Sequence, residues 1–175
     1  MEKYHPVASQ IKKFIEDAGI WHEVFEHEPV TTSEDASKVR TGYVLSQGVK
    51  ALVVKAKLNN IKQFIMVCVP GDKKFSAEKL KKNFSITDTR FASEDEVAEI
   101  TGGIKRGGVP PFGNLFGLPI FADVGIFNND PTSQGFDGAR KIIFNAGDRS
   151  FSVAMLSADW QKLVNPQVAE IAEAA

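Results

Sequence analysis

Two apolar runs joined by a pair of asparagines decide the fold class: VKALVVKAKL at positions 49–58, NN at 59–60 and IKQFIMVCV at 61–69. We predict strands over Val49–Leu58 and Gln63–Val69, with a turn at Asn59-Asn60 and a stop at Pro70-Gly71. Apolar and polar residues do not alternate from position 64 onward, which is typical of a strand buried on both faces. The sequence therefore predicts a hairpin that reaches the protein core.

Helical and extended segments surround this hairpin in an irregular order. An apolar stripe with helical spacing predicts a first helix that begins at Pro6 and ends at Gly19. Further helices are expected to begin at Thr32, Ser76, Ser93, Ser157 and Pro166, the last being a C-terminal helix over 166–175. Further strands are expected over Ile20–Glu28, Pro119–Phe127, Lys141–Asn145 and Phe151–Leu156, with a loop over Asn128–Arg140. This mixture favours an α+β fold in one domain over residues 1–175, with its core at about 5–165.

The composition restricts the possible partners. The chain has 175 residues and a formal net charge of −1, so nucleic-acid binding would need a local basic patch. Its single cysteine excludes an intrachain disulfide and favours a reducing compartment. No segment has the pattern of a signal peptide or the length of a membrane span. We therefore expect a cytoplasmic protein without a membrane partner.

The common catalytic motifs are missing from the sequence. It contains no nucleophile elbow, no His-Glu-x-x-His, no phosphate loop that ends in Gly-Lys-Ser/Thr and no cysteine pair for zinc. The only histidines are His5, His22 and His27, which do not have metal-ligand spacing. Cys68 lies inside an apolar run and is predicted to be an inert core residue. No metal or cofactor is expected.

The most informative motif is a stiff loop, Gly107-Gly108-Val109-Pro110-Pro111-Phe112-Gly113. Its two leading glycines permit positive φ and allow backbone N–H groups to approach a ligand closely. The two prolines restrict the chain that follows, and Phe112 offers an apolar face. Two interpretations stay open at this point: a tight structural turn, or a preorganised wall that binds a carbonyl or an oxyanion.

Three further positions are candidates for a site. Lys50, at the entry of the first hairpin strand, is either a strand-end residue that reaches solvent or a fixed cation facing an anionic or carbonyl group. His27, between two glutamates, is either a surface histidine or a pocket residue that titrates near neutral pH. Thr32 and Ser33 offer hydroxyls, of which one is expected to cap a helix.

Basic residues gather in two stretches, one around the helix predicted after Ser76 and one just before the glycine loop. They are Lys73, Lys74, Lys79, Lys81, Lys82, Lys105 and Arg106. Such a cluster is either a solvated surface or a patch that binds phosphate groups.

These motifs, taken in order, resemble those of one known family. The stretch EHEPVTTSEDA at 26–36 resembles its opening, KALVV at 50–54 its lysine strand, and Thr101-Gly102 with the loop at 107–113 its glycine loop. Asp123 and the segment from Asn145 to Ser152 fall at its closing strands. The family is the YbaK family, which includes free-standing editing proteins and the editing domain inserted in bacterial prolyl-tRNA synthetase. The resemblance covers about residues 5–165 and implies a mixed, mostly antiparallel, barrel-like sheet flanked by helices.

The resemblance also implies an activity, because family members hydrolyse wrongly made aminoacyl-tRNA. Lys50 would hold the terminal phosphate or the ester region, and Gly107 and Gly108 would bind the carbonyl as catalytic groups. Val109, Pro111 and Phe112 would form a sieve for small amino acids. The expected substrate-binding residues are His27, Thr32, Ser33, Val109, Pro110, Pro111, Phe112, Gly113, Asp123, Asn145, Gly147 and Ser152.

An aminoacyl ester is already reactive, so a positioned water or ribose hydroxyl could suffice in place of a protein nucleophile. We therefore predict a trans-acting aminoacyl-tRNA deacylase for tRNA-Pro or another tRNA that carries a small amino acid. The tRNA acceptor end, and a synthetase as a second candidate, are the expected partners, whether the protein is a monomer or a homodimer.

Two alternatives are a non-catalytic module with the same pocket and a hydrolase of another small ester. The sequence also departs from two branches of the family. Pro110-Pro111-Phe112 differs from the loop of the cysteine-clearing branch, and no histidine follows His27 as one does in the synthetase-inserted branch. The amino-acid preference of neither branch is carried over.

Overall fold

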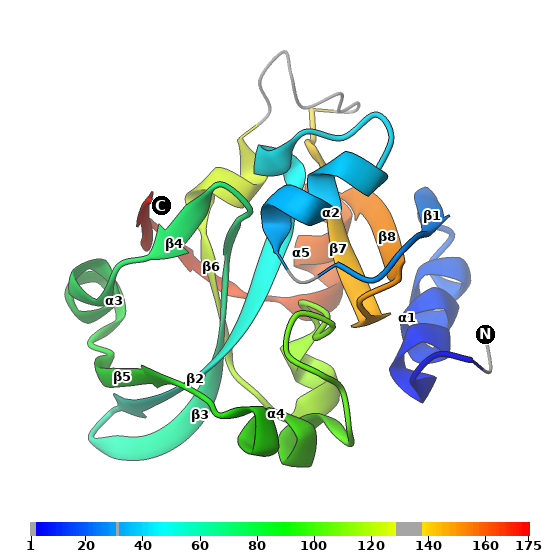
Figure 1. Ribbon diagram of the computed structural model, residues 1–175. Helices are drawn as coiled ribbons and strands as arrows, with labels where there is room; N and C mark the ends of the chain where they lie inside the picture. Colours follow the sequence, from blue (N-terminus) through cyan, green and yellow to red (C-terminus); the bar gives the residue numbers. More distant parts are fainter. Residues whose placement is uncertain (1–2, 31, 129–137) are drawn as a thin grey trace.

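The computed structural model describes residues 3–30, 32–128 and 138–175 (Figure 1). Its strands are β1 (His22–Glu26), β2 (Val49–Leu58), β3 (Ile61–Pro70), β4 (Lys73–Phe75), β5 (Thr87–Phe91), β6 (Ile120–Asp123), β7 (Lys141–Asp148), β8 (Phe151–Leu156), β9 (Gln167–Ala169) and β10 (Ala172–Ala174). Its helices are α1 (Pro6–Asp17), α2 (Ser33–Val39), α3 (Ala77–Phe84), α4 (Glu94–Thr101) and α5 (Ser157–Val164), with short 3-10 turns η1 (Leu45–Gln47), η2 (Gly113–Phe116) and η3 (Val124–Phe127). None of the described helices is long and apolar enough to cross a membrane.

The β2–β3 hairpin is the centre of the fold, as predicted. Its ladder runs through ten residue pairs, from Val49 opposite Pro70 to Leu58 opposite Ile61. Both turn asparagines have positive φ, 54° at Asn59 and 62° at Asn60. Asparagine tolerates this conformation better than most residues. The second strand begins two residues earlier than expected because Ile61 and Lys62 continue the ladder.

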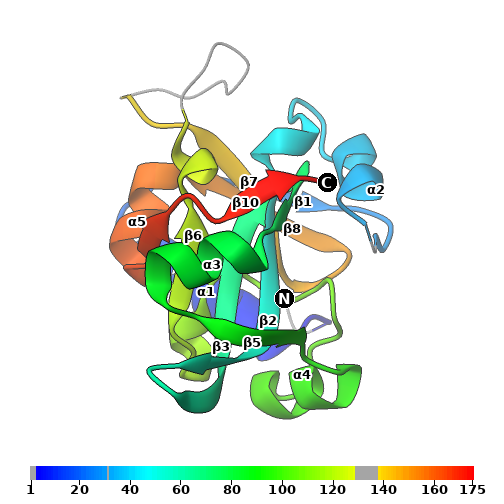
Figure 2. The same cartoon turned by 90° about the vertical axis from the view of Figure 1, so that its left-hand side faces the viewer.

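The strand β3 separates two apolar clusters, which confirms that it is buried on both faces. Met66 and Cys68 face a large cluster that includes α1, β7, β8 and α5. Ile65 and Val67 face a smaller cluster that includes Leu80 of α3. Figure 2 shows α3 lying across this second face of the sheet. The central sheet is therefore covered on one side by the three-stranded sheet with its helices, and on the other by α3.

The α+β fold class is confirmed, and the sheets are mixed and mostly antiparallel. The main sheet has the order β5-β2-β3-β6-β9, with β3–β6 and β6–β9 parallel. The other two sheets are β1-β8-β7 and β10-β4. Within the described residues no sheet closes on itself, so the expected barrel-like shape is only loosely met. The edge strand β5 pairs with β2 from position 54 onward, and the first half of β2 is left with an open edge.

The prediction of a C-terminal helix over 166–175 is wrong. The segment forms β9 and β10 in place of a helix. The carboxylate of Asp123 accepts hydrogen bonds from the backbone N–H groups of Ile171 and Ala172, both at 2.9 Å. Lys74 and Lys79 form ion pairs with Glu173 and Glu170 of the same segment. These contacts hold the tail extended against the local helical preference of its alanines and glutamates.

Replacement of Asp123 by Ala is expected to lower the free energy of unfolding by about 2 kcal/mol, because three backbone N–H groups lose a charged acceptor. The third is that of Gly125, at 2.8 Å from Oδ2. Urea unfolding measures the change. Asp123→Asn keeps one amide oxygen as an acceptor and should lose less. Equal stability of the wild type and Asp123→Ala would contradict this role.

Two sequence predictions differ in extent from the structure. The strand expected over Pro119–Phe127 is the shorter β6, followed by the turn η3. The side chain of Asp123 caps this turn by accepting a hydrogen bond from the N–H of Gly125. The strand expected to end at Asn145 continues to Asp148 as β7. Most of the loop predicted over Asn128–Arg140 lies outside the described residues.

Candidate functional site

A cavity of about 490 Å³ lies along the open edge of β2. Residues 49–53 of this strand and Gly48 before it line the cavity, and α2, α4, the glycine loop and the end of β7 contribute to its walls. The backbone N–H of Ala92 donates to the carbonyl of Val53, so odd-numbered residues of β2 direct their polar backbone groups toward this edge. The N–H and C=O of Ala51 therefore face the cavity. Its size suits a small ligand.

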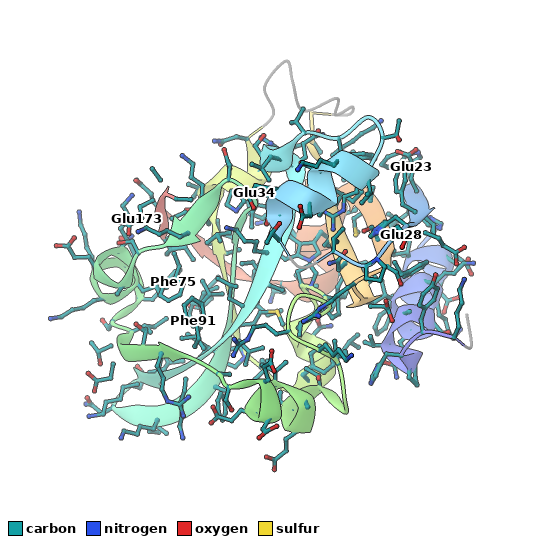
Figure 3. All side chains as sticks on the ribbon, viewed as in Figure 1. Glu23, Glu28, Glu34, Phe75, Phe91 and Glu173 are labelled. Atoms are coloured by element: carbon teal, nitrogen blue, oxygen red, sulfur yellow. The ribbon has the colours of Figure 1, made fainter. Side chains whose placement is uncertain are left out.

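The cavity has a polar end and an apolar end. Thr32, Ser33, Glu34 and Arg40 line it from α2 and its flanks. Near the other end it is lined by the apolar residues Val53, Ala92, Val97 and Val109, together with Arg106, whose guanidinium donates to the carbonyl of Ala92. Figure 3 shows Glu34 on α2 and Phe91 on β5, which contribute to the lining from opposite ends of the first half of β2.

Positive charge predominates in the lining. Four cations, Lys50, Arg40, Arg106 and Arg149, line the cavity with one carboxylate, that of Glu34. Lys50 is half-buried in the wall. Burial lowers the pKa of its ammonium, and the carboxylates of Glu34 and Asp72 partly oppose that shift. Such a site is suited to an anionic ligand or to negative charge that develops during a reaction.

The start of the glycine loop is held by three hydrogen-bond donors. Each donates to one of three successive backbone carbonyls, those of residues 106, 107 and 108. Arg149 donates from Nε to the carbonyl of Arg106 at 2.8 Å. Asn145 donates from Nδ2 to the carbonyl of Gly107 at 2.7 Å. The N–H of Gly147 donates to the carbonyl of Gly108 at 2.8 Å. We call these donors the carbonyl clamp, and they fix the orientation of three peptide planes.

The clamp determines which N–H groups of the loop are available. In a trans peptide the N–H points opposite to the C=O, so fixing the carbonyls of residues 106 and 108 also orients the N–H groups of Gly107 and Val109. Neither of these two groups has a hydrogen-bond acceptor in the described part of the chain, and both residues line the cavity. The N–H of Gly108 donates to the carbonyl of Lys105 at 2.9 Å. The N–H of Gly108, which the sequence analysis expected to bind a carbonyl, is therefore already used within the loop, whereas those of Gly107 and Val109 are available in the described structure.

A buried polar network lies behind this wall. The Oγ of Ser152 is 2.7 Å from Nε2 of His27 and 3.1 Å from both Nε of Arg40 and Oδ1 of Asn145. Nη2 of Arg40 donates to the same Asn145 oxygen at 2.9 Å. Ser152 is fully buried and does not line the cavity, so its contact with His27 is not an accessible nucleophile–base pair. His27 and Ser152 support the site and do not line it.

Arg40 is the most deeply buried cation of the cavity, with 7% of its surface exposed. Burial lowers the pKa of its guanidinium to about 10. No carboxylate lies within 4.0 Å of it among the residues that the structure describes. A charge in this environment needs compensation from hydrogen bonds or from a ligand.

The second half of the glycine loop does not reach the cavity. Phe112 is fully buried against Phe144, with ring centroids 5.6 Å apart. The carbonyl of Pro111 accepts from the indole of Trp160 at 2.8 Å. Pro110 is buried beside them, and a Cβ on Gly113 would lie 2.8 Å from the side chain of Ile120. The sieve predicted from Pro111 and Phe112 is therefore corrected: Val109 lines the cavity, and the residues after it anchor the loop in the core.

Two more residues that were predicted to bind substrate have structural roles. Asp123 lies at the end of β6, where it holds the C-terminal strands, and it does not line the cavity. Gly147 has a φ of +101°, and a Cβ there would lie 2.5 Å from Cγ1 of Val7. The space beside the Cα of Gly147 is therefore filled by α1, while its N–H belongs to the carbonyl clamp.

The seven predicted phosphate-binding cations do not form one patch. Arg106 lines the cavity, and its guanidinium donates to the carbonyl of Ala92. Lys105 is exposed beside it. Lys73, Lys74, Lys79, Lys81 and Lys82 belong to β4 and α3, on the other face of the main sheet. The prediction of one continuous patch is thus wrong, because the main sheet separates the lysines of β4 and α3 from Lys105 and Arg106.

Of the cavity-lining residues, Lys50, Gly107, Val109, Thr32, Ser33, Asn145 and Arg106 were expected from the sequence. Arg40, Arg149 and Phe91 were missed. Arg40 follows a short helix and has the sequence context of an ordinary solvated arginine. Arg149 follows β7, and its clamp contact depends on the approach of a loop more than forty residues away. Only the tertiary structure reveals these contacts.

Comparisons with known proteins identify the family. The model of the aminoacyl-tRNA editing domain matches residues 27–163. The chain belongs to this family. It is an aminoacyl-tRNA deacylase, a hydrolase of carboxylic ester bonds, and the resemblance noted in the sequence is confirmed.

The relatives of this editing domain come from two kinds of protein. One is the multifunctional Ser/Thr-tRNA deacylase ProXp-y of Escherichia coli K12, 33% identical over 145 residues that cover 83% of this chain and 80% of the relative. Another is a proline–tRNA ligase of Stenotrophomonas maltophilia R551-3, 28% identical over 80% of this chain and 22% of the ligase. A solved structure described as a candidate trans-editing enzyme for prolyl tRNA synthetase has a TM-score of 0.75 at 24% identity, over 97% of this chain and 98% of that one.

Proposed function

We propose that this editing domain acts in trans on tRNA mischarged with a small amino acid, and that serine and threonine are the first candidates. The similarity to the Ser/Thr-tRNA deacylase motivates these two amino acids. The relation to proline–tRNA ligase motivates tRNA-Pro as the carrier and a synthetase as a partner. The lone buried cysteine is in keeping with a reducing, cytoplasmic location.

The observation that carries the proposal is the clamped glycine loop beside Lys50 in a small cationic cavity. The N–H groups of Gly107 and Val109 would donate to the ester carbonyl and to the oxyanion that forms when it is attacked. The ammonium of Lys50 would bind the terminal phosphate or the ester region of the tRNA. The backbone carbonyl of Ala51, at the open edge of β2, would accept from the α-ammonium of the amino acid.

Hydrolysis in this site would not use a protein nucleophile. Cys68 is fully buried and its burial raises the pKa of the thiol, while Thr32 is engaged as the cap of α2. The attacking water would be positioned by the adjacent ribose hydroxyl of the substrate, against a carbonyl already held by the loop. Attack forms the C–O bond to water, and collapse breaks the ester C–O bond, with the proton passing to the ribose oxygen.

The apolar end of the cavity would set the size limit. Val53, Val97 and Val109 bound a space for a short side chain. A synthetase pocket distinguishes substrates that differ by one methylene by only about 1–3 kcal/mol, so a second sieve of this kind has a use.

The test is hydrolysis of one tRNA charged in turn with Ala, Cys, Ser, Thr or Pro. We expect the purified protein to release one or two small amino acids well above the rate without protein. Retained tRNA binding without release would indicate a binding module in place of an enzyme on these substrates. Release from free amino-acid esters but from none of the charged tRNAs would also contradict the proposal.

A further inference from the structure

Phe91 is a large apolar residue that stays exposed in the wall of the cavity. It is 57% exposed and lines the cavity from the end of β5. Its backbone position is fixed, because Phe91 is paired with Val54 of β2 and the N–H of Ala92 donates to the carbonyl of Val53 at 2.9 Å. A single exposed apolar residue is ordinary on a protein surface. One that is held on a strand in a cavity wall is a candidate for contact with the ligand.

The ring of Phe91 is also held by a second aromatic ring. Phe75 of β4 contacts it in an edge-to-face arrangement, with ring centroids 5.5 Å apart and an angle of 68° between the planes. Figure 3 shows these two side chains next to each other. Phe75 restricts the Phe91 ring without covering it, and more than half of the surface of Phe91 is left for another contact.

The two faces of β2 give the cavity two different sides. The three valines that bound the proposed amino-acid space belong to the large apolar cluster on one face of the main sheet. Leu52 packs against the smaller cluster on the opposite face, and so does Phe75. Alternate residues of a strand share a face, so Lys50 lies on the side of Leu52. Phe91, in contact with Phe75, is therefore on the side of Lys50 and apart from the amino-acid space.

A ligand on this side has to match a cation beside an aromatic ring. An ammonium suits a phosphate or an ester oxygen, and a phenyl ring suits the flat face of a nucleobase, because unpaired RNA bases are commonly bound by stacking on aromatic side chains. A tRNA ends in a single-stranded adenosine whose ribose carries the amino acid. The base, the ester and the phosphate of this nucleotide are all attached to the same sugar. One terminal nucleotide can therefore meet both Lys50 and Phe91.

We infer that the ring of Phe91 stacks on the terminal adenine of the tRNA and holds the 3′ nucleotide while its ester is hydrolysed. Phe91 is then a substrate-binding residue for a part that all tRNAs share, whichever amino acid is attached. This inference rests on the proposed deacylase function and adds a contact with the nucleotide to it.

Phe91→Leu tests the contact, because it removes the aromatic ring and keeps an apolar side chain. We expect KM for a preferred aminoacyl-tRNA to rise by about fivefold to a hundredfold, the range for loss of one base–aromatic stack, with kcat nearly unchanged. The rise should be the same for each amino acid that the wild type releases, since the adenine is common to these substrates. Steady-state hydrolysis measures both constants.

Phe14→Leu is the matched control, because Phe14 of α1 is also an exposed phenylalanine and does not line the cavity. It should leave both constants unchanged. An unchanged KM in Phe91→Leu, measured on protein with a wild-type unfolding temperature, would overturn the inference. A KM that rises for one amino acid and not for another would overturn it as well, because Phe91 would then belong to the amino-acid space.

Phe91→Trp gives a second measurement that does not depend on catalysis. The indole should stack on the base in the same way, so its fluorescence should fall when uncharged tRNA is added. The same titration of the wild type corrects for Trp21 and Trp160. The same tRNA without its terminal adenosine should quench the indole less. An equal effect of the two tRNAs would contradict the stacking.

The proposed function and the assignment of Phe91 fail in different ways. If the wild type hydrolyses none of the charged tRNAs, the proposed function fails. If it hydrolyses them with a KM that does not depend on the ring at position 91, only the stacking contact fails.

Discussion

Lys50→Ala is expected to lower kcat/KM for aminoacyl-tRNA hydrolysis by about a hundredfold to a thousandfold, the range for loss of one donor that stabilises developing negative charge in an active site. The ammonium is half-buried in the cavity wall, where its field is less screened than at the surface. Arg106 and Arg149 are engaged with backbone carbonyls and are not placed to replace it. Single-turnover deacylation of a preferred aminoacyl-tRNA measures the effect.

Two variants make the Lys50 result specific. Lys62→Ala removes an exposed lysine of β3, far along the hairpin, and should leave hydrolysis unchanged. Lys50→Arg keeps the charge and should restore part of the rate. Thermal unfolding of Lys50→Ala should match the wild type, because removal of a partly desolvated cation carries little cost in stability. Full activity in Lys50→Ala would contradict both the role of the ammonium and the proposed mechanism.

Asn145→Ala is expected to lower kcat by about a hundredfold with little change in KM. Its amide is the donor that fixes the carbonyl of Gly107, at 2.7 Å. Without it the peptide plane between Gly107 and Gly108 can rotate, and because this plane joins the two that carry the N–H groups of Gly107 and Val109, both proposed donors are displaced. Misplacement by about 1 Å is enough for a loss of this size. The cavity walls that bind the rest of the substrate remain. Steady-state kinetics on the preferred substrate separate the two constants.

The Asn145 prediction has its own internal control. Asn145→Asp retains an acceptor for Arg40 but places a carboxylate against the Gly107 carbonyl, so it should be at least as slow as Asn145→Ala. If Asn145→Asp were as active as the wild type, the carbonyl clamp would not contribute to the rate.

The sequence predicted what depends on local pattern. The β2–β3 hairpin follows from two apolar runs and an Asn-Asn turn, and the strand entry of Lys50 follows from the same pattern. The leading glycines of the loop marked a wall of the cavity because close backbone approach needs them. These features depend on residues that are neighbours in the chain.

The remainder depends on contacts between distant residues. We expected Phe112 to form an apolar wall of the cavity, but its side chain is buried in the core against Phe144. The C-terminal segment has the composition of a helix, yet the carboxylate of Asp123 holds it extended. The cavity role of Arg40 depends on Ser152, more than a hundred residues away. Periodicity and capping rules contain no information about such partners.

The carbonyl clamp has a consequence for how this enzyme can vary over generations. Its proposed catalytic donors are main-chain N–H groups, which a point mutation to any residue except proline leaves in place. Inherited changes in what these donors contribute to the rate must therefore act through the residues that orient them, and three of these, Asn145, Gly147 and Arg149, lie at every second position of one short segment. A gain or loss of a single residue there would displace all three together, so this segment should not tolerate a change of length.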